Sequence, residues 1–499
     1  MNYWFDYPTK KTLPHGQSSG KSTYKAYLAK NEYENIQFVI SSDRPVDDLA
    51  LELSDFCDNS KNALDAQILF LHYIETKKGE LYPDPASPLT SRFSLGAGKN
   101  QAFLIKIKSK KDTPAGEYSA TLTLKASGES LLSAKIYAKV WDFALPDEPS
   151  CTTFVELRKP IMQKFHNKKS DEELDCLYKK YYDFLLDNKI SAAMLPYDLL
   201  SDKADEYIND PRVTSFVIPY EEGKIKEYYA KLSKNPQGLK KGVFYPLDEP
   251  TEKENYDKLM ALHDKIEADF PEYRIVTPFY RNPKFDENTD AVDLMTGKIN
   301  VWCPKSYMFD NINIYESGKK ISEAPFAGRM RGRKAAGDEI WWYVCWEPGA
   351  PFCNLFVDMP GILHRLLFWQ QKLYEVDGFL YWAANYWNEV DDPWSDMRTI
   401  KSLTTLFKAD DVFGDGSLLY NGNKIGIDGP VGSLRLENIR DGIEDFEYLD
   451  IAQKLFGKEF AEQCIKNLVT SLTEYDADDE KLMAMRIELG NKIEKYLEA

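Results

Sequence analysis

Hydrophobic and polar residues alternate with a period of two along much of the first 145 residues. In the segment 103–108 apolar residues alternate with lysines, and the segments 118–124 and 136–140 repeat the alternation. Such short alternating runs, separated by turn signals, are typical of half-buried antiparallel strands. The pattern predicts a β-sandwich over residues 1–145.

After a linker at 145–150 that contains two prolines, short apolar runs alternate with longer amphipathic segments. Helical spacing predicts helices over 171–186, 252–270 and 360–374, and a helical extension from about residue 433. The expected strands are 153–157, 191–195, 215–219, 242–247, 275–279, 299–302, 340–346 and 378–382. Eight strands with intervening helices fit a (β/α)8 barrel, so we predict a barrel over residues 151–499 behind the sandwich.

The charge balance restricts the partners of the chain. Its 499 residues include 63 Lys and Arg against 80 Asp and Glu, a net charge of −17. Nucleic-acid binding and docking on anionic lipid both need a cationic face, so neither partner is expected. No apolar run approaches the ~18 residues of a membrane span, so no membrane insertion is expected. A neutral glycan remains compatible with this balance.

Cysteine, histidine and the first residues bear on compartment and cofactors. The seven cysteines are scattered without a CxxC pair, and the N-terminus has no basic and apolar signal pattern. Both features predict a reduced, cytoplasmic setting. The five histidines show no metal-ligand spacing, and no phosphate-binding glycine motif follows a strand. We therefore expect neither a metal nor a cofactor.

The segment 242–250 is a predicted strand that ends in two adjacent carboxylates, Asp248 and Glu249, followed by Pro250. The C-terminal ends of barrel strands carry the active site. Two neighbouring acids push their pKa values apart, so that one can act as a proton donor while the other stays ionised, as glycoside hydrolysis requires. The alternative is a surface turn, which Asp and Pro both favour.

Aromatic and polar residues accumulate near the ends of the other predicted strands. Aromatic walls with a few polar groups can clamp a pyranose, whereas each aromatic taken singly could equally be core packing. The candidate substrate-binding residues are Arg158, Tyr280, Trp302, Tyr307, Tyr343, Trp346, Glu347, Trp382, Asn385 and Trp387.

Glu347 follows the seventh predicted strand and is a candidate nucleophile for a second mechanism. A retaining barrel glycosidase can place its acid/base after the fourth strand and a nucleophile after the seventh, ~5–5.5 Å apart. Glu249 and Glu347 could form that pair and act on a sugar without an acetamide, although Glu347 could also be a turn carboxylate. A third hypothesis is a carbohydrate-binding protein without catalysis, because the fold alone does not decide function.

The segment 244–250 resembles the catalytic segment of glycoside hydrolase family 123. The segments 378–387, with 392–394 beyond it, and 433–449 resemble the same wider group, and 31–38 matches its sandwich module. The resemblance implies an N-terminal β-sandwich, a catalytic barrel and exo-β-N-acetylgalactosaminidase activity.

The resemblance also implies a substrate-assisted retaining mechanism, in which the sugar's own 2-acetamido oxygen attacks the anomeric carbon and forms an oxazolinium-like intermediate. Asp248 would orient the acetamide and stabilise its positive charge. Glu249 would act as general acid and then as general base. No protein nucleophile is then required. The expected substrate is a glycan, and the missing secretion signal favours an imported oligosaccharide.

Overall fold

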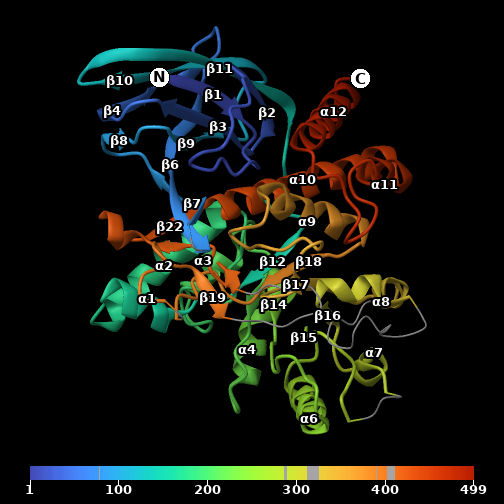
Figure 1. Ribbon diagram of the computed structural model, residues 1–499. Helices are drawn as coiled ribbons and strands as arrows, with labels where there is room; N and C mark the ends of the chain where they lie inside the picture. Colours follow the sequence, from blue (N-terminus) through green and yellow to red (C-terminus); the bar gives the residue numbers. More distant parts are fainter. Residues whose placement is uncertain (78, 286–288, 312–324, 389, 402–410) are drawn as a thin grey trace.

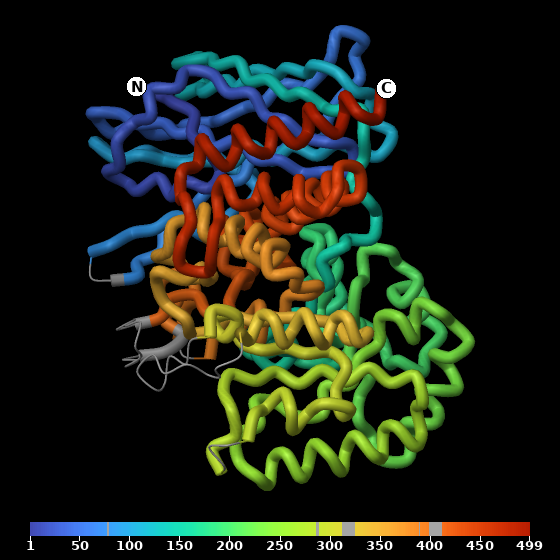
Figure 2. The backbone as a smooth tube through the Cα atoms, turned by 90° about the vertical axis from the view of Figure 1, so that its right-hand side faces the viewer, coloured from blue at the N-terminus to red at the C-terminus, as the bar shows by residue number. Residues whose placement is uncertain are grey.

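The computed structural model describes residues 1–77, 79–285, 289–311, 325–388, 390–401 and 411–499. A β-rich N-terminal region lies at the top of Figure 1, and a group of parallel strands surrounded by helices lies below it. Helix α10 (Leu434–Phe456) runs between the two parts, and the turned view of Figure 2 agrees with this placement. The C-terminal helix α12 (Asp479–Leu497) packs beside the β-rich region.

The N-terminal strands pair in the order β1-β3-β9-β6-β5-β10-β11-β2. All of these pairs are antiparallel except that of β11 with β2. The strands are β1 (Asn2–Asp6), β2 (Tyr24–Lys30), β3 (Tyr33–Ser42), β4 (Val46–Leu53), β5 (Phe56–Cys57), β6 (Ala63–Lys77), β7 (Glu80–Pro88), β8 (Phe93–Leu95), β9 (Lys99–Lys108), β10 (Gly116–Ala126) and β11 (Glu129–Ala144). The alternating segments 118–124 and 136–140 lie in β10 and β11, and their apolar residues enter one buried cluster, as period two requires.

The parallel strands of the second part follow one another along the chain. A five-stranded sheet has the order β12-β18-β17-β16-β15, and β13 pairs with β14. Parallel bridges join Val155 to Ala192 and Phe244 to Ile275, and the Val217 amide donates to the Ala193 carbonyl (2.7 Å). The strands are β12 (Thr152–Val155), β13 (Phe216–Val217), β14 (Gly242–Val243), β15 (Val276–Phe279), β16 (Val301–Pro304), β17 (Glu339–Val344) and β18 (Gly378–Tyr381).

The expected strand at 191–195 is reduced to a single bridge at Ala192. Hydroxyl groups take up the backbone amides that a longer ladder would use. The Ser191 amide donates to Thr153 Oγ1 and the Thr214 amide to Ser191 Oγ, both at 2.8 Å. Side-chain to backbone bonds of this kind compete with regular strands.

Most expected helices form close to their predicted bounds. The segments 171–186, 252–270 and 360–374 correspond to α2 (Asp171–Asp187), α6 (Lys253–Asp269) and α9 (Gly361–Leu373). Ser170 caps α2 with a reciprocal bond to Glu173. No helix among the described residues has the length and apolar character needed to cross a bilayer. The remaining α-helices of the described residues are α1 (Lys159–His166), α3 (Ala204–Ile208), α4 (Ile225–Leu232), α5 (Pro236–Lys241), α7 (Ala291–Met295), α8 (Phe326–Ala335) and α11 (Lys458–Lys466).

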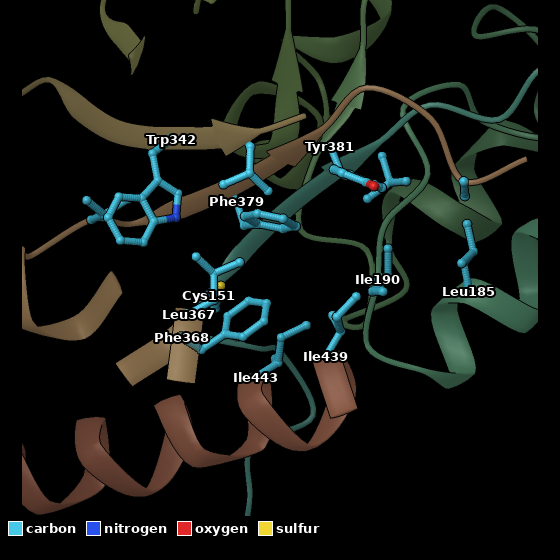
Figure 3. Packing of buried hydrophobic residues seen from close by; sticks show 14 of the residues in the cluster. Cys151, Leu185, Ile190, Trp342, Leu367, Phe368, Phe379, Tyr381, Ile439 and Ile443 are labelled. Atoms are coloured by element: carbon cyan, nitrogen blue, oxygen red, sulfur yellow. The ribbon is translucent and has the colours of Figure 1, made fainter. Parts of the chain in front are cut away.

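A hydrophobic layer joins the parallel strands to α9 and α10 (Figure 3). Trp342 and Phe379 project from β17 and β18 toward Phe368 of α9 and Ile443 of α10. The next residues along the strands, Tyr343 and Leu380, belong to a separate buried cluster with other strand residues and therefore face the other way. This alternation decides which strand residues reach a central site and which pack against helices.

Buried ion pairs tie the N-terminal region to the helices. Arg365 of α9 donates to both carboxylate oxygens of Asp445 on α10, at 2.6 and 2.9 Å, and Arg486 of α12 donates to Oδ1 at 3.0 Å. Arg486 also pairs with Glu34 of β3 at 2.8 Å and with Glu32 just before that strand. All five side chains are at most 1% exposed. We call these five residues the interface ion cluster.

Candidate active site

A cavity of about 750 Å³ opens where the parallel strands end. Its lining comes from residues in the C-terminal halves of β12, β13, β15, β17 and β18 or just beyond a strand end, together with residues that follow the bridge at Ala192. The lining residues are Phe154, Glu156, Arg158, Ala193, Met194, Val217, Tyr245, Pro246, Leu247, Asp248, Glu249, Pro278, Tyr343, Cys345, Trp346, Leu380, Tyr381, Trp382 and Tyr386. Six of the twelve predicted site residues are among them.

Glu249 lies in the cavity in a left-handed backbone conformation, with φ of 42°. Its amide donates to the Pro278 carbonyl at 3.2 Å, and its Oε1 accepts a hydrogen bond from the Tyr343 hydroxyl. The carboxylate remains one-third exposed. A non-glycine residue is costly in this region and persists where its surroundings hold it, which is common at functional sites.

Asp248 lies at the exposed mouth of the same cavity. The Tyr245 hydroxyl donates to its Oδ1 at 2.7 Å. Consecutive residues of an extended chain point to opposite sides, and the left-handed turn at Glu249 breaks that alternation. Both neighbouring carboxylates therefore border one cavity, and each is held by a tyrosine.

Lys305 and Glu347 form a buried ion pair behind the cavity wall. The two side chains are each 1% exposed, and Lys305 Nζ lies 2.6 Å from Glu347 Oε1. The same ammonium is 3.8 Å from Glu249 Oε1. It also lies 5.1–5.3 Å from the ring centroids of Tyr280, Tyr343 and Trp346. Glu347 is not among the residues that line the cavity.

The ionisation of this pair reflects burial and mutual attraction. Burial raises the pKa of Glu347 to about 7, although Lys305 opposes the rise. For Lys305, burial disfavours the charged form, but Cys345 and Glu347 outweigh it and raise its pKa above the usual value. The folded protein therefore holds a proton on Glu347 more tightly than the unfolded chain does.

This difference makes stability depend on pH. Because the folded pKa of Glu347 is near 7 and the ordinary value is 4.5, the contribution is present below pH 4.5 and is lost as the pH rises to 7. The loss amounts to up to about 3 kcal/mol. Glu347→Gln should flatten the unfolding free energy between pH 5 and 7, measured by denaturant melts at several pH values. An unchanged slope would contradict this assignment.

An aromatic wall with one arginine closes another side of the cavity. The Arg158 guanidinium lies 5.1 Å from the ring of Trp382 and 5.2 Å from that of Tyr386. Its Nη2 donates to Glu156 at 2.9 Å. Asn385 does not line the cavity but holds Arg158 by its backbone, accepting from the amide at 2.9 Å and donating to the carbonyl at 3.1 Å.

Trp302 and Trp387 lie outside the cavity, contrary to the prediction of substrate contact. Val301 and Cys303 of β16 face the interior cluster, so the intervening Trp302 faces the helices and donates to Asp338 at 2.7 Å. Trp387 is buried and donates to the Leu419 carbonyl at 2.9 Å. Both rings pack in the core.

Tyr280 and Tyr307 also stand back from the cavity. The Tyr307 hydroxyl donates to the Tyr280 carbonyl at 2.9 Å, and Tyr307 is fully buried. Tyr280 contributes its ring to the cage around Lys305. These two residues support the wall from behind.

The sequence interpretation missed three residues that shape the site. Tyr245 and Lys305 each lie within two residues of a strand end. The other site residues were predicted from that same position, so this signal could have found both. Asp415 accepts hydrogen bonds from Trp382 and Tyr381 behind the wall, and burial raises its pKa to about 6. Nothing in the local sequence separates Asp415 from an ordinary turn aspartate.

Within the described residues, a possible metal-ligand group is formed by His263, Asp264 and Glu267 of α6, whose ligand atoms lie within 4.8 Å of one another. Lys298 donates to Asp264 at 2.9 Å, and the Tyr273 hydroxyl contacts His263 Nε2 at 3.0 Å. The group already has protein partners, and none of its members lines the cavity.

Residues 290–452 match the family model described as glycoside hydrolase 123, catalytic domain. That range includes Lys305, Trp382 and Asp415, and it begins after Asp248 and Glu249. No sequence among the curated proteins matches the chain.

The fold is similar to that of a family 123 glycoside hydrolase from Clostridium perfringens, solved in work on glycolipid glycan hydrolysis. The TM-score is 0.70 at 12% identity, and the match covers 99% of this chain and 98% of the other. A family 39 glycoside hydrolase from Bacteroides cellulosilyticus WH2 reaches a TM-score of 0.35 at 10% identity, over 87% of this chain and 82% of the other. Residues 290–452 therefore match the catalytic domain of glycoside hydrolase family 123, and the fold of the whole chain is similar to that of a member of this family.

Proposed function

We propose that the chain is a retaining exo-glycosidase that releases terminal β-linked N-acetylgalactosamine with the help of the substrate's own acetamide. The observation that carries the proposal is the placement of Asp248 and Glu249 on one cavity, each bonded to a tyrosine hydroxyl. We also infer that the linked parallel strands form a (β/α)8 barrel over 151–499, behind a β-sandwich over 1–145.

In this mechanism Glu249 donates its proton to the glycosidic oxygen while the acetamide oxygen attacks the anomeric carbon. The bond to the leaving group breaks, and an oxazolinium forms. Asp248 accepts the acetamide N–H and stabilises the developing positive charge. Glu249 then takes a proton from a water molecule, and the water oxygen attacks the anomeric carbon from the face opposite the acetamide. This attack opens the oxazolinium ring, and the two successive displacements retain the configuration of the anomeric carbon.

The placement of Glu347 supports the acetamide as nucleophile. A protein nucleophile must reach the anomeric carbon, but Glu347 is 1% exposed, bonded to Lys305 and absent from the cavity lining. Extracting it would separate a buried ion pair, which is costly. We therefore assign Glu347 to the support of Lys305 rather than to covalent catalysis.

Paired substrates test the proposal. We expect an aryl 2-acetamido-2-deoxy-β-galactoside to be hydrolysed and the matching aryl β-galactoside to be inert, because only the first carries the nucleophile. A thiazoline that mimics the oxazolinium should inhibit competitively. Equal turnover of both substrates with thiazoline insensitivity would support the Glu249–Glu347 mechanism instead. Calorimetric binding without hydrolysis across a wide glycoside panel would support the non-catalytic hypothesis.

A further inference from the structure

Asp415 lies fully buried behind the aromatic wall of the cavity. The Trp382 indole N–H lies 3.0 Å from its Oδ1 and 3.1 Å from its Oδ2, and the Tyr381 hydroxyl donates to Oδ1 at 3.1 Å. Trp382 lines the cavity, and the Arg158 guanidinium lies 5.1 Å from the centroid of its ring. The orientation of a cavity-lining ring therefore depends on a carboxylate that does not itself line the cavity.

The turn that carries Asp415 is tightly packed on both sides. Gly414 and Gly416 flank it with φ of 79° and 66°, a region that favours glycine. A Cβ atom at Gly416 would lie 2.4 Å from the Trp382 ring, and one at Gly414 would lie 2.7 Å from the Arg435 guanidinium. The turn is thus clamped between the indole on one side and a buried arginine on the other.

Arg435 in turn fixes the backbone on both sides of Asp415. Its Nη1 donates to the Gly414 carbonyl at 2.6 Å, and its Nη2 donates to the Ser417 carbonyl. Nη1 also donates to the Leu355 carbonyl at 2.9 Å, and two further donors reach Asp84, with Nε–Oδ1 and Nη2–Oδ2 distances of 2.9 Å. Both members of this ion pair are fully buried. A paired guanidinium holds a fixed planar geometry, which suits a positioning role.

Asp84 belongs to β7, a strand of the N-terminal region. This strand pairs with β6 and with β22 (Pro430–Ser433), directly before α10. In Figure 1 it extends from the β-rich part down toward the parallel strands. The contacts therefore run without interruption from the N-terminal region to the wall of the cavity.

We propose that Asp84, Arg435 and Asp415 are positioning residues that fix the Trp382 ring against the sugar, which makes the N-terminal region a working part of the active site. The proposal rests on the proposed function only for the contact between Trp382 and the sugar. Misplacement of a contacting group by about 1 Å can cost a reaction on the order of 10²-fold.

Asp415→Leu tests the proposal, since leucine fills the space but accepts no hydrogen bond. We expect kcat/KM to fall by about 10- to 100-fold. Asp415→Asn, which keeps one acceptor oxygen, should recover part of the loss. The matched control is Asp338→Leu, which breaks an aspartate–indole bond at Trp302, outside the cavity. It should leave kcat/KM within twofold of wild type.

Fluorescence provides a readout that needs no substrate. The emission of each protein minus that of its Trp382→Phe derivative isolates the Trp382 indole. We expect this component to shift in Asp415→Leu and, to a smaller extent, in Asp84→Asn, but not in Asp338→Leu. If the wild-type protein hydrolyses no acetamido sugar, the proposed function is refuted. A shift of the Trp382 emission in Asp415→Leu would still support the positioning role in that case.

Two results would overturn the inference. One is a folded Asp415→Leu or Asp415→Asn protein with wild-type kcat/KM and an unshifted Trp382 component. The other is an Asp84→Asn protein that unfolds more easily but keeps wild-type kinetics and Trp382 emission, which would confine Asp84 to stability and remove the N-terminal region from the site.

Discussion

Glu249→Gln is expected to lower kcat/KM for an aryl 2-acetamido-2-deoxy-β-galactoside by about 10²–10⁴-fold, the usual contribution of a general acid. Glutamine keeps the shape and can still accept a hydrogen bond from Tyr343, but it has no proton to donate. The loss should be large for a poor leaving group such as a simple phenol. It should shrink for a dinitrophenol, which departs without protonation. Steady-state rates with both substrates measure the difference.

Glu221→Gln is the matched control for this experiment. Glu221 also accepts a hydrogen bond from a tyrosine hydroxyl, that of Tyr228 at 2.8 Å, but it lies outside the cavity. It should leave the rates for both leaving groups unchanged. If Glu249→Gln stays within a few-fold of wild type on the poor leaving group, Glu249 is not the acid.

Asp445→Ala is expected to lower the free energy of unfolding by about 3–5 kcal/mol, the cost of breaking a buried ion pair on one side. Asp445 accepts from Arg365, Arg486 and the Trp369 indole, all of them buried. Removing it leaves two guanidinium groups without that partner in an interior that solvates charge poorly. Urea unfolding followed by circular dichroism and by tryptophan fluorescence measures the change.

An exposed ion pair provides the comparison. Lys25 and Glu117 lie 2.8 Å apart on the N-terminal strands, with side chains 35% and 62% exposed. Glu117→Ala should cost less than about 1 kcal/mol, because solvent screens such pairs. A similar small cost for Asp445→Ala would mean that the interface ion cluster adds nothing to stability.

The elements that could be predicted are those set by local periodicity. The helices at 171–186 and 360–374 have long amphipathic patterns, and the pair Asp248–Glu249 follows a short apolar run at a strand end. Trp302 could not be placed correctly, because a shift of one residue along a strand moves a side chain from the interior to the helix side. Which face of a strand packs against helices and which faces the interior is decided by tertiary packing.

The polar contacts behind the cavity could not be predicted from the sequence, because they join residues that are far apart along the chain. Asp84 and Arg435 are 351 positions apart, and neither stands in a local pattern that marks a buried pair. Asp415 differs from other turn aspartates only through Trp382, which the fold brings to it from 33 positions away. Such long-range contacts become visible only when the whole chain is assembled.

The interface ion cluster has a consequence for how this protein can be rearranged. A fragment that begins after the linker would present Arg365 and Arg486 without Glu32 and Glu34, and the separated strands would present the two glutamates without the arginines. We therefore expect that neither part can be replaced on its own by the corresponding part of another protein. A chimera will assemble only if the donor brings the matching charges.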